Sequence, residues 1–313
     1  MLDSEIIDAI SIIVIGKNEE KNLENLYKSL ISIDLIKEVI YVDSASKDNS
    51  ILISQNYCDF IYELEESPFL CASAGRYIGV KKAKYKWVLF LDGDMELEQE
   101  FIDFLNTKKL LFFEKKIAGF VGYYNYCYSD GTNFENRLLQ PANKLVTHFG
   151  GAVLLNKYLV LEVGNWNPAV VANEEIDLYV RIQNLGYKVF GLDKNMVIHR
   201  AKKTNNLQTL KEVILPINRR YFGYGQVLVS QFRHKTLFLF LLKNPFPLIY
   251  LILFLLMPFF SFLIILIILF MFYVTVKKKW YYNIIYISDL FRGLAGVLTY
   301  SNYKPKFKNH IWK

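Results

Sequence analysis

Over the first two hundred residues, short runs of large apolar residues alternate with segments whose apolar residues have helical spacing. Residues 9–15 form a continuous run rich in Ile and Val, which is typical of a strand buried on both faces. Leu23, Leu26 and Leu30 follow at helical spacing. The same patterns predict further strands at 38–42, 59–62, 87–91, 119–128 and 150–155, and helices at 72–83 and 174–185. Strands that alternate with helices predict an α/β domain with a mostly parallel central sheet, covered on both faces.

The last third of the chain has a different pattern. No charged residue occurs between Asn244 and Val276, whereas a helix of about 20 apolar residues is enough to span a bilayer. Lys and Arg flank this block on both sides, which favours two cytoplasmic flanks. We therefore expect residues 236–276 to form a transmembrane or re-entrant helical hairpin. Because Lys243, Pro245 and Pro247 interrupt its first half, a single long or interfacial segment is an alternative, and a buried core helix is another.

The charge is distributed as unevenly as the apolar residues. Residues 1–199 hold 20 basic and 28 acidic residues, a net −8, whereas residues 200–313 hold 17 basic and 2 acidic residues, a net +15. The basic part suits anionic lipid head groups better than nucleic acid, because no nucleic-acid motif accompanies it. We expect four parts: a catalytic domain at 1–200, a basic juxtamembrane segment at 201–235, the hairpin at 236–276, and a basic cytoplasmic tail at 277–313.

Composition excludes several classes. A hydrophobic fraction of 53% excludes a disordered chain, and three cysteines in 313 residues exclude a disulfide scaffold. Three acidic residues within Met1–Asp8 are inconsistent with a signal peptide. We therefore expect the first part to remain on the cytoplasmic side of a membrane.

Polar residues follow three of the predicted strands, at the edge where ligands bind in open α/β sheets. Lys17–Glu20 follows the first strand, Asp43–Asp48 the second, and Asp92-Gly93-Asp94 the strand at 87–91. Two carboxylates separated by one small residue suit Mg²⁺ or Mn²⁺, which take oxygen ligands and share them with phosphates. Glycine between them lets a phosphate approach the backbone. The pattern predicts a site for a metal ion and a phosphorylated ligand.

These segments resemble family 2 glycosyltransferases with the GT-A fold. The resemblance covers about residues 10–200 in the family's order. It is carried by Ile12–Glu20, by Val42–Asp48 as the second nucleotide-contacting loop, by Ala74–Gly79, by Leu89–Asp94 as the metal motif, and by Gly150–Ala152 and Glu174–Leu178 as acceptor-side elements. Matches in this order and at plausible spacing are far more specific than any one of them.

The family transfers a sugar from a nucleotide-sugar to an acceptor hydroxyl, with inversion at the anomeric carbon. On the donor side, the resemblance implies that Asp43 hydrogen-bonds the base and that Asn18 and Glu19 border the nucleoside. It further implies that Arg76 lies near the pyrophosphate, and that Asp92 contacts ribose or a metal-bound water or serves as a ligand.

The resemblance also implies a metal ligand and a catalytic base. Asp94 would ligate Mn²⁺ or Mg²⁺, with His199 as a late metal ligand or a phosphate contact; a purely structural histidine is the alternative. The base that takes the acceptor's proton would be Glu175, with Glu174 second. Glu175 stands where Asp is more common in the family, which leaves a carboxylate about one methylene longer. Ser44 and Tyr77 also depart from the family pattern, where Asp and Asn are frequent.

Two arginines precede the apolar block. Arg219 and Arg220 could grip a diphosphate or the phosphate of a lipid-linked acceptor, because arginine makes bidentate contacts with phosphate. The alternative is a basic patch that only anchors the chain at a membrane.

Together these features predict a metal-dependent inverting glycosyltransferase at the cytoplasmic face of a membrane, acting on a lipid-linked glycan for cell-surface polysaccharide assembly. A UDP-sugar is the family's default donor. A polyprenyl-phosphate sugar synthase is an alternative within the fold, and a non-catalytic scaffold that binds nucleotide or lipid is an alternative of another class. The presence of all the key carboxylates favours an enzyme.

Overall fold

The computed structural model describes residues 3–5, 7–67, 70–106, 111–113, 116–128, 132–137, 144–146, 149–201, 222–232, 246–258, 260, 263–278, 280–300 and 303–310. Arg219 and Arg220 lie outside these residues. The chain divides into two compact units. The first comprises residues 1–169, 174–203 and 302–313, and the second comprises residues 170–173 and 204–301.

Four parallel strands form the centre of the first unit. They are β2 (Ile10–Gly16), β3 (Ile36–Asp43), β4 (Phe60–Leu64) and β5 (Trp87–Asp92), in the order β5-β2-β3-β4. The chain runs from β2 outward to β3 and β4 and then returns to β5 on the other side of β2. The strand order therefore reverses between β2 and β5, and ligands in such sheets bind beyond the carboxyl ends of the strands at that point.

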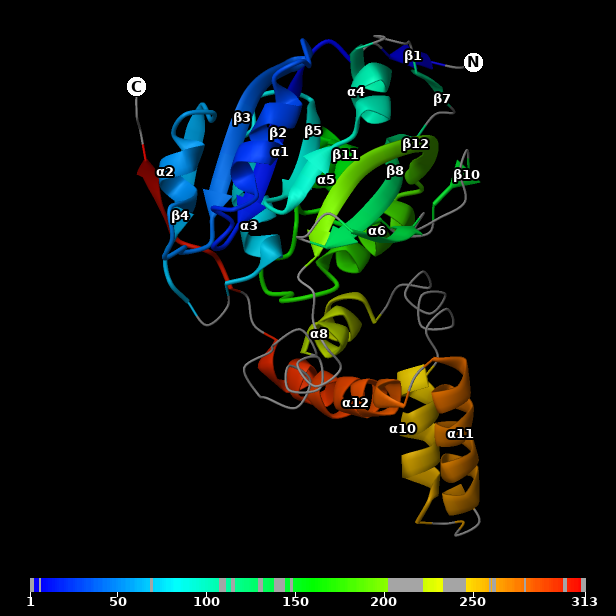
Figure 1. Ribbon diagram of the computed structural model, residues 1–313. Helices are drawn as coiled ribbons and strands as arrows, with labels where there is room; N and C mark the ends of the chain where they lie inside the picture. Colours follow the sequence, from blue (N-terminus) through cyan, green and yellow to red (C-terminus); the bar gives the residue numbers. More distant parts are fainter. Residues whose placement is uncertain are drawn as a thin grey trace. The chain divides into compact units, whose positions relative to one another are not determined.

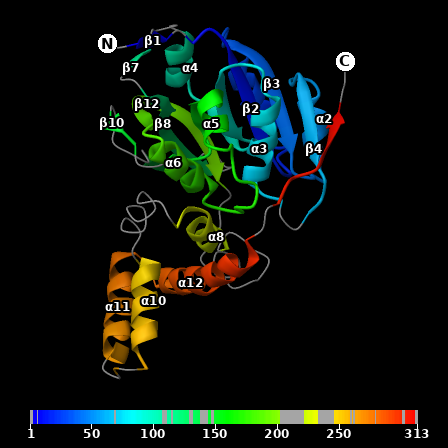
Figure 2. The ribbon, with the colours of Figure 1, turned by 180° about the vertical axis from the view of Figure 1, so that it is seen from behind.

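Helices cover both faces of this sheet, as the alternating pattern predicts. Helices α1 (Leu23–Leu30) and α2 (Ser50–Ser54) lie on one face (Figure 1). Helices α3 (Ala72–Lys82), α5 (Lys157–Glu162) and α6 (Glu174–Asn184) lie on the opposite face (Figure 2). Close packing of α3 depends on glycine, because a Cβ at Gly79 would lie 2.4 Å from Cγ2 of Ile13.

The complete sheet is mixed, so the expectation of a mostly parallel sheet is wrong. Strand β11 (Val153–Asn156) runs antiparallel to β5 and to β8 (Ile117–Tyr128). Strand β12 (Lys188–Ala201) runs parallel to β8 and antiparallel to β6 (Met95–Leu97). Buried strands are apolar whatever the direction of their neighbours, so the hydrophobic pattern does not fix their pairing. The remaining elements of this unit are β9 (Asn133–Arg137), β10 (Lys144–Leu145), α4 (Gln99–Asn106) and a separate pair formed by β1 (Asp3–Glu5) and β7 (Leu111–Phe113).

The end of the chain is not a separate basic tail, contrary to expectation. Strand β13 (Phe307–His310) pairs antiparallel with β4 and becomes the edge strand of the sheet. His310 Nε2 lies 2.7 Å from Glu63 Oε2, and the Phe307 ring packs edge-on to Tyr62 at 5.5 Å between centroids. Lysines at alternate positions interrupt the apolar pattern that would predict this strand, although lysine is a common residue on edge strands.

The second unit is helical in its described residues. It contains α8 (Phe222–Gln231), α10 (Phe246–Leu256), α11 (Leu263–Lys277) and α12 (Tyr281–Thr299). Helices α10 and α11 lie side by side where the hairpin is predicted (Figure 1), and the Tyr250 hydroxyl donates a hydrogen bond of 2.5 Å to Asn283 Oδ1. Among the described residues, no helix is long and apolar enough to cross a membrane. The predicted crossing is therefore not found in the described part of 236–276.

Candidate active site

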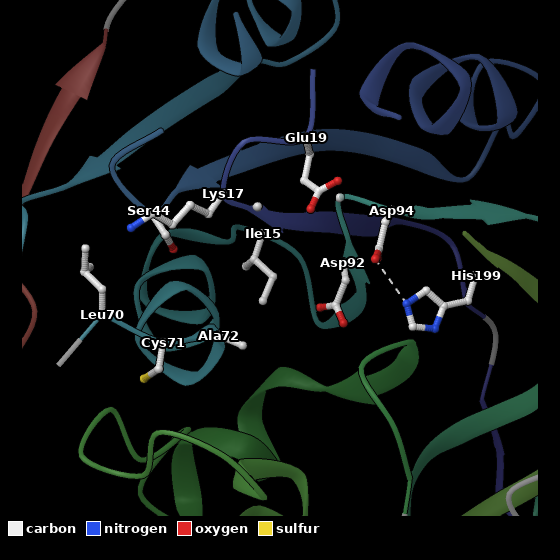
Figure 3. A pocket seen from close by; sticks show the side chains of 12 residues that line it. Ile15, Lys17, Glu19, Ser44, Leu70, Cys71, Ala72, Asp92, Asp94 and His199 are labelled. Carbon is white, nitrogen blue, oxygen red and sulfur yellow. Dashed lines mark hydrogen bonds and ion pairs between the residues drawn. The ribbon is translucent and has the colours of Figure 1, made fainter. Parts of the chain in front are cut away.

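A pocket of about 270 Å³ lies at the carboxyl ends of β2 and β5. The first turn of α3 and the end of β12 complete it (Figure 3). The residues that line it are Ile15, Gly16, Lys17, Glu19, Ser44, Leu70, Cys71, Ala72, Asp92, Gly93, Asp94 and His199. Glu19, Asp92, Asp94 and His199 are thus brought together as the sequence predicts.

Asp94 and His199 form a pair across the pocket. His199 Nε2 lies 3.2 Å from Asp94 Oδ2 (Figure 3). The pairing of β6 with β12 sets this distance, because Met95 lies opposite His199 and the Arg200 N–H donates to the Asp94 carbonyl at 2.9 Å. Burial lowers the pKa of His199, but the hydrogen bond and charge of Asp94, aided by Asp92 and Glu19, outweigh it and raise the pKa.

The chemistry of this pair suits a divalent cation. Asp94 offers an oxygen ligand and His199 a nitrogen ligand, and Nδ1 of His199 is buried without a hydrogen-bond partner among the described residues. Within the same residues, no group of three or more His, Cys, Asp or Glu side chains is arranged to hold a metal ion. The residues present therefore fit a cation that takes its remaining ligands from donor phosphates and water, as Mg²⁺ commonly does.

Arg76 joins three carboxylates beside the pocket. Its Nη2 lies 2.6 Å from Asp92 Oδ1, and its Nη1 lies 2.7 Å from Glu174 Oε1 and 3.5 Å from Glu175 Oε1. The Arg76 side chain is 1% exposed and does not line the pocket. The Arg76 guanidinium therefore lies beside the pocket and faces the carboxylates, and its predicted place near the pyrophosphate stays a prediction.

The two glutamates at the start of α6 differ in accessibility. The Glu174 side chain is 7% exposed, whereas that of Glu175 is 22% exposed. Burial raises the pKa of Glu175, the negative charge of Glu174 raises it further, and Arg76 opposes both effects. Glu175 therefore has the more exposed side chain of the pair, together with a raised pKa.

Asp43 is fully buried and holds its own loop. Its Oδ1 accepts hydrogen bonds from the hydroxyls of Tyr41 at 2.9 Å and Ser46 at 2.5 Å, and its Oδ2 accepts from the Ser46 N–H at 2.7 Å. The residue is 0% exposed. Asp43 is therefore not among the residues that line the pocket, whereas Ser44 is. The hydrogen bond that Asp43 is expected to accept from the base of a donor stays a prediction.

Asn18 connects the two loops that follow β2 and β3. Its N–H donates to Ser46 Oγ at 2.8 Å, and its Oδ1 accepts from the Lys47 N–H at 2.8 Å. Asn18 has a φ of 58°, in the left-handed region that asparagine tolerates better than most residues. Glu19 follows it and lines the pocket, whereas Asn18 holds the two loops together through these hydrogen bonds.

Two contributors to the site could not be predicted from the sequence. Trp166 is fully buried, and the guanidinium carbon of Arg76 lies 4.9 Å from the centre of its ring. Gly151 is so close to Asp92 and Arg76 that a Cβ would collide with both. The Gly150-Gly151 pair was visible as a motif, but its contact with Asp92 was not, and no local signal marks Trp166.

Comparison with known proteins identifies the first unit. Residues 11–153 match the model of the family described as glycosyl transferase family 2. This part of the chain is thus similar to family 2 glycosyltransferases. That match contains the pocket residues from Glu19 to Asp94, and it confirms that this protein is a glycosyltransferase. No curated protein sequence matches the chain.

Solved glycosyltransferases share the fold. Mannosyltransferase PcManGT from Pyrobaculum calidifontis, solved with GDP-Man and Mn²⁺, has a TM-score of 0.60 and 13% identity over 95% of this chain and 90% of that chain. S. aureus TarS 1-349 has a TM-score of 0.51 and 17% identity over 77% of this chain and 74% of that chain. A TarS structure with UDP-GlcNAc has a TM-score of 0.50 and 15% identity over 72% and 67%. At these identities the likeness establishes the fold.

Proposed function

We propose that this family 2 glycosyltransferase moves a sugar from a nucleoside-diphosphate donor to an acceptor hydroxyl, with inversion and with help from a divalent cation. One observation carries the proposal: Arg76 ties Asp92, which lines the pocket, to Glu174 and Glu175 at the start of α6. Donor-side and acceptor-side carboxylates therefore lie within one cluster, as a single displacement requires.

Glu175 is the proposed base. The acceptor oxygen forms a bond to the anomeric carbon while the bond from that carbon to the diphosphate oxygen breaks, and Glu175 Oε takes the acceptor's proton. Burial and the neighbouring Glu174 raise the pKa of Glu175, which makes the carboxylate a stronger base once it is ionised. Glu174 stays paired with Arg76 and supports this arrangement.

Asp94 and His199 are the proposed protein ligands of Mn²⁺ or Mg²⁺, with Asp92 beside them. When bound, such an ion neutralises negative charge on the leaving diphosphate. Two observations support the assignment: the 3.2 Å approach of His199 to Asp94, and the presence of Mn²⁺ in the PcManGT structure, which shares the fold. We propose a UDP-sugar as the donor, since TarS 1-349 was solved with UDP-GlcNAc.

Nucleotide binding and sugar transfer test this function. The full chain, purified in detergent, is heated with UDP, GDP, CDP or TDP, with Mn²⁺ or with a chelator. A ligand at a hundredfold excess over Kd stabilises the folded state by about 2.7 kcal/mol. A rise in the unfolding temperature that requires Mn²⁺ therefore identifies the base of the donor nucleotide.

Labelled nucleotide-sugars then report sugar transfer. Asp94→Asn is expected to abolish the shift and the transfer, while Asp103→Asn, at an exposed carboxylate on α4, leaves both unchanged. No shift with any nucleotide would refute the proposed donor site.

We further propose that the enzyme works on a lipid-linked acceptor at the cytoplasmic face of a membrane. The observation behind this is the exposure of apolar side chains on α10 and α11: Leu255 is 62% exposed, Ile265 62% and Phe272 68%. Exposed Lys277 and Lys278 follow directly, and cations beside an apolar surface suit anionic head groups. The helices would enter one leaflet without crossing it.

Flotation with vesicles tests the membrane proposal. The full chain is expected to float with vesicles containing phosphatidylglycerol and to float less with phosphatidylcholine alone. Replacing Leu255, Ile265 and Phe272 by serine should abolish flotation without changing nucleotide binding. Failure of the unaltered chain to float with either vesicle would refute the membrane proposal and leave the transferase proposal intact.

A further inference from the structure

Arg76 is a buried cation that touches functional carboxylates from two other elements without lining the pocket. It projects from α3, while Asp92 ends β5 and Glu174 and Glu175 begin α6. Its side chain is 1% exposed. An arginine that bound a donor phosphate directly would need a surface facing the pocket, which Arg76 lacks.

The guanidinium divides its two amino groups between the two sides of the site. Nη2 pairs with Asp92 at 2.6 Å, and Nη1 pairs with Glu174 at 2.7 Å and lies 3.5 Å from Glu175. The guanidinium is planar and rigid, and its two amino groups form a fork with a fixed separation. This fork therefore fixes where the paired carboxylates lie relative to each other. A lysine ammonium is a point charge on a flexible stem and would not fix that separation.

Neighbouring residues hold the guanidinium itself in place. The Trp166 ring lies 4.9 Å from the guanidinium carbon, and arginine stacks favourably on such a ring. On another side, a Cβ at Gly151 would lie only 2.8 Å from Nη2. The fork is therefore confined by packing, which is what a positioning role needs.

Stability alone does not account for this cluster. Buried ion pairs often add little net stability, because desolvation offsets their attraction. Here one guanidinium faces three carboxylates, so the cluster keeps excess negative charge within a buried region. Such an arrangement is better explained by the positions it gives to Asp92 and Glu175 than by the stability it adds.

We propose that Arg76 is a positioning residue that sets the separation between the donor-side Asp92 and the base Glu175, and that it does not bind the donor diphosphate itself. This inference rests on the proposed function. It predicts that altering the fork impairs turnover while donor binding persists. A direct diphosphate contact predicts the reverse, a weaker donor affinity.

Arg76→Lys in the full chain tests the inference by separating kcat from the donor KM. We expect kcat to fall about 100-fold, the size of effect that a misplacement of about 1 Å produces, with the donor KM changed by less than about threefold. Arg181→Lys is the matched control. Arg181 lies on α6 with a side chain 16% exposed, pairs with Asp177 at 2.6 Å, and donates to the carbonyls of Val163 and Asn165. Its replacement is expected to leave kcat within about threefold.

A charge-compensated variant covers the case in which loss of Arg76 impairs folding. Arg76→Met with Glu174→Gln removes one positive and one negative charge, so the charge of the cluster is unchanged while the fork is gone. We expect this double variant to fold and to have a kcat at least tenfold lower than that of Glu174→Gln alone. A decrease of that size is about what the loss of one transition-state contact produces. Recovery of kcat to that of Glu174→Gln, or a rise in donor KM in Arg76→Lys with kcat unchanged, would overturn the inference. Absence of transfer by the unaltered enzyme would instead refute the proposed function.

Discussion

Gly151 lies against the carboxylate of Asp92 so closely that a Cβ there would stand 2.3 Å from Asp92 Oδ2. The same Cβ would stand 2.8 Å from Arg76 Nη2. Neither partner is the far end of a side chain with room to move, since each is paired to the other at 2.6 Å. The absence of a side chain at Gly151 therefore permits the ion pair that links the pocket to α6.

Gly151→Ala should consequently separate Arg76 from Asp92. We expect kcat to fall at least tenfold, in line with losing one well-placed polar contact in a transition state. Gly79→Ala is the control, because its Cβ would meet Ile13 at 2.4 Å, away from the pocket lining. That variant should lose about 1–3 kcal/mol of stability through overpacking and keep its kcat per folded molecule. Equal loss of kcat in both variants would show that Gly151 acts through stability alone.

The pH dependence of turnover should report on Glu175. Its pKa is raised by burial and by the charge of Glu174, and only its ionised form can accept a proton. Turnover should therefore rise with pH until Glu175 is ionised and then level off. Glu174→Gln removes a negative neighbour, so it should lower the pKa of Glu175 and move the rising limb to lower pH. A limb that stays in place, or moves to higher pH, would contradict the assignment of Glu175 as the base.

Asp43 should matter first for stability. Asp43→Ala leaves the buried Tyr41 hydroxyl and the Ser46 N–H without their acceptor, and an unsatisfied buried group costs about 1–3 kcal/mol. Denaturant unfolding measures this loss. Tyr41→Phe removes one of these bonds and should cost about 0.5–1.5 kcal/mol. If Asp43→Ala instead keeps full stability and weakens only nucleotide binding, then Asp43 contacts the base and the buried arrangement described above does not persist in the bound enzyme.

The central strands could be predicted because their apolar runs are unbroken. Residues 9–15 and 87–91 were expected as strands, and β2 (Ile10–Gly16) and β5 (Trp87–Asp92) differ from those bounds by one residue. Strand direction and partners could not be predicted in the same way. The return of β13 to β4 joins residues more than two hundred positions apart, and nothing in Phe307–His310 encodes that partner.

For the site, the positions of residues in the sequence could be predicted, but the contacts of their side chains could not. Asp94 could be predicted because its motif follows a predicted strand, and Glu175 and His199 because the chain resembles family 2 glycosyltransferases around them. The orientations of side chains were not accessible from motifs. No motif indicates that the Arg76 guanidinium lies over the Trp166 ring or that the Asp43 carboxylate accepts a hydrogen bond from Tyr41.

His199 and Asp94 can be tested against a second pair of the same chemistry. His310 and Glu63 approach to 2.7 Å at the sheet edge, with side chains 25% and 27% exposed, the same fractions as His199 and Asp94. His199→Gln should raise the Mn²⁺ concentration needed for half-maximal transfer by about 10–100-fold, because loss of a ligand costs at least as much as loss of a supporting contact. His310→Gln should not change that concentration, since His310 does not line the pocket. Titration of transfer with Mn²⁺ distinguishes the two, and an equal response of both variants would mean that His199 supports the fold rather than the metal.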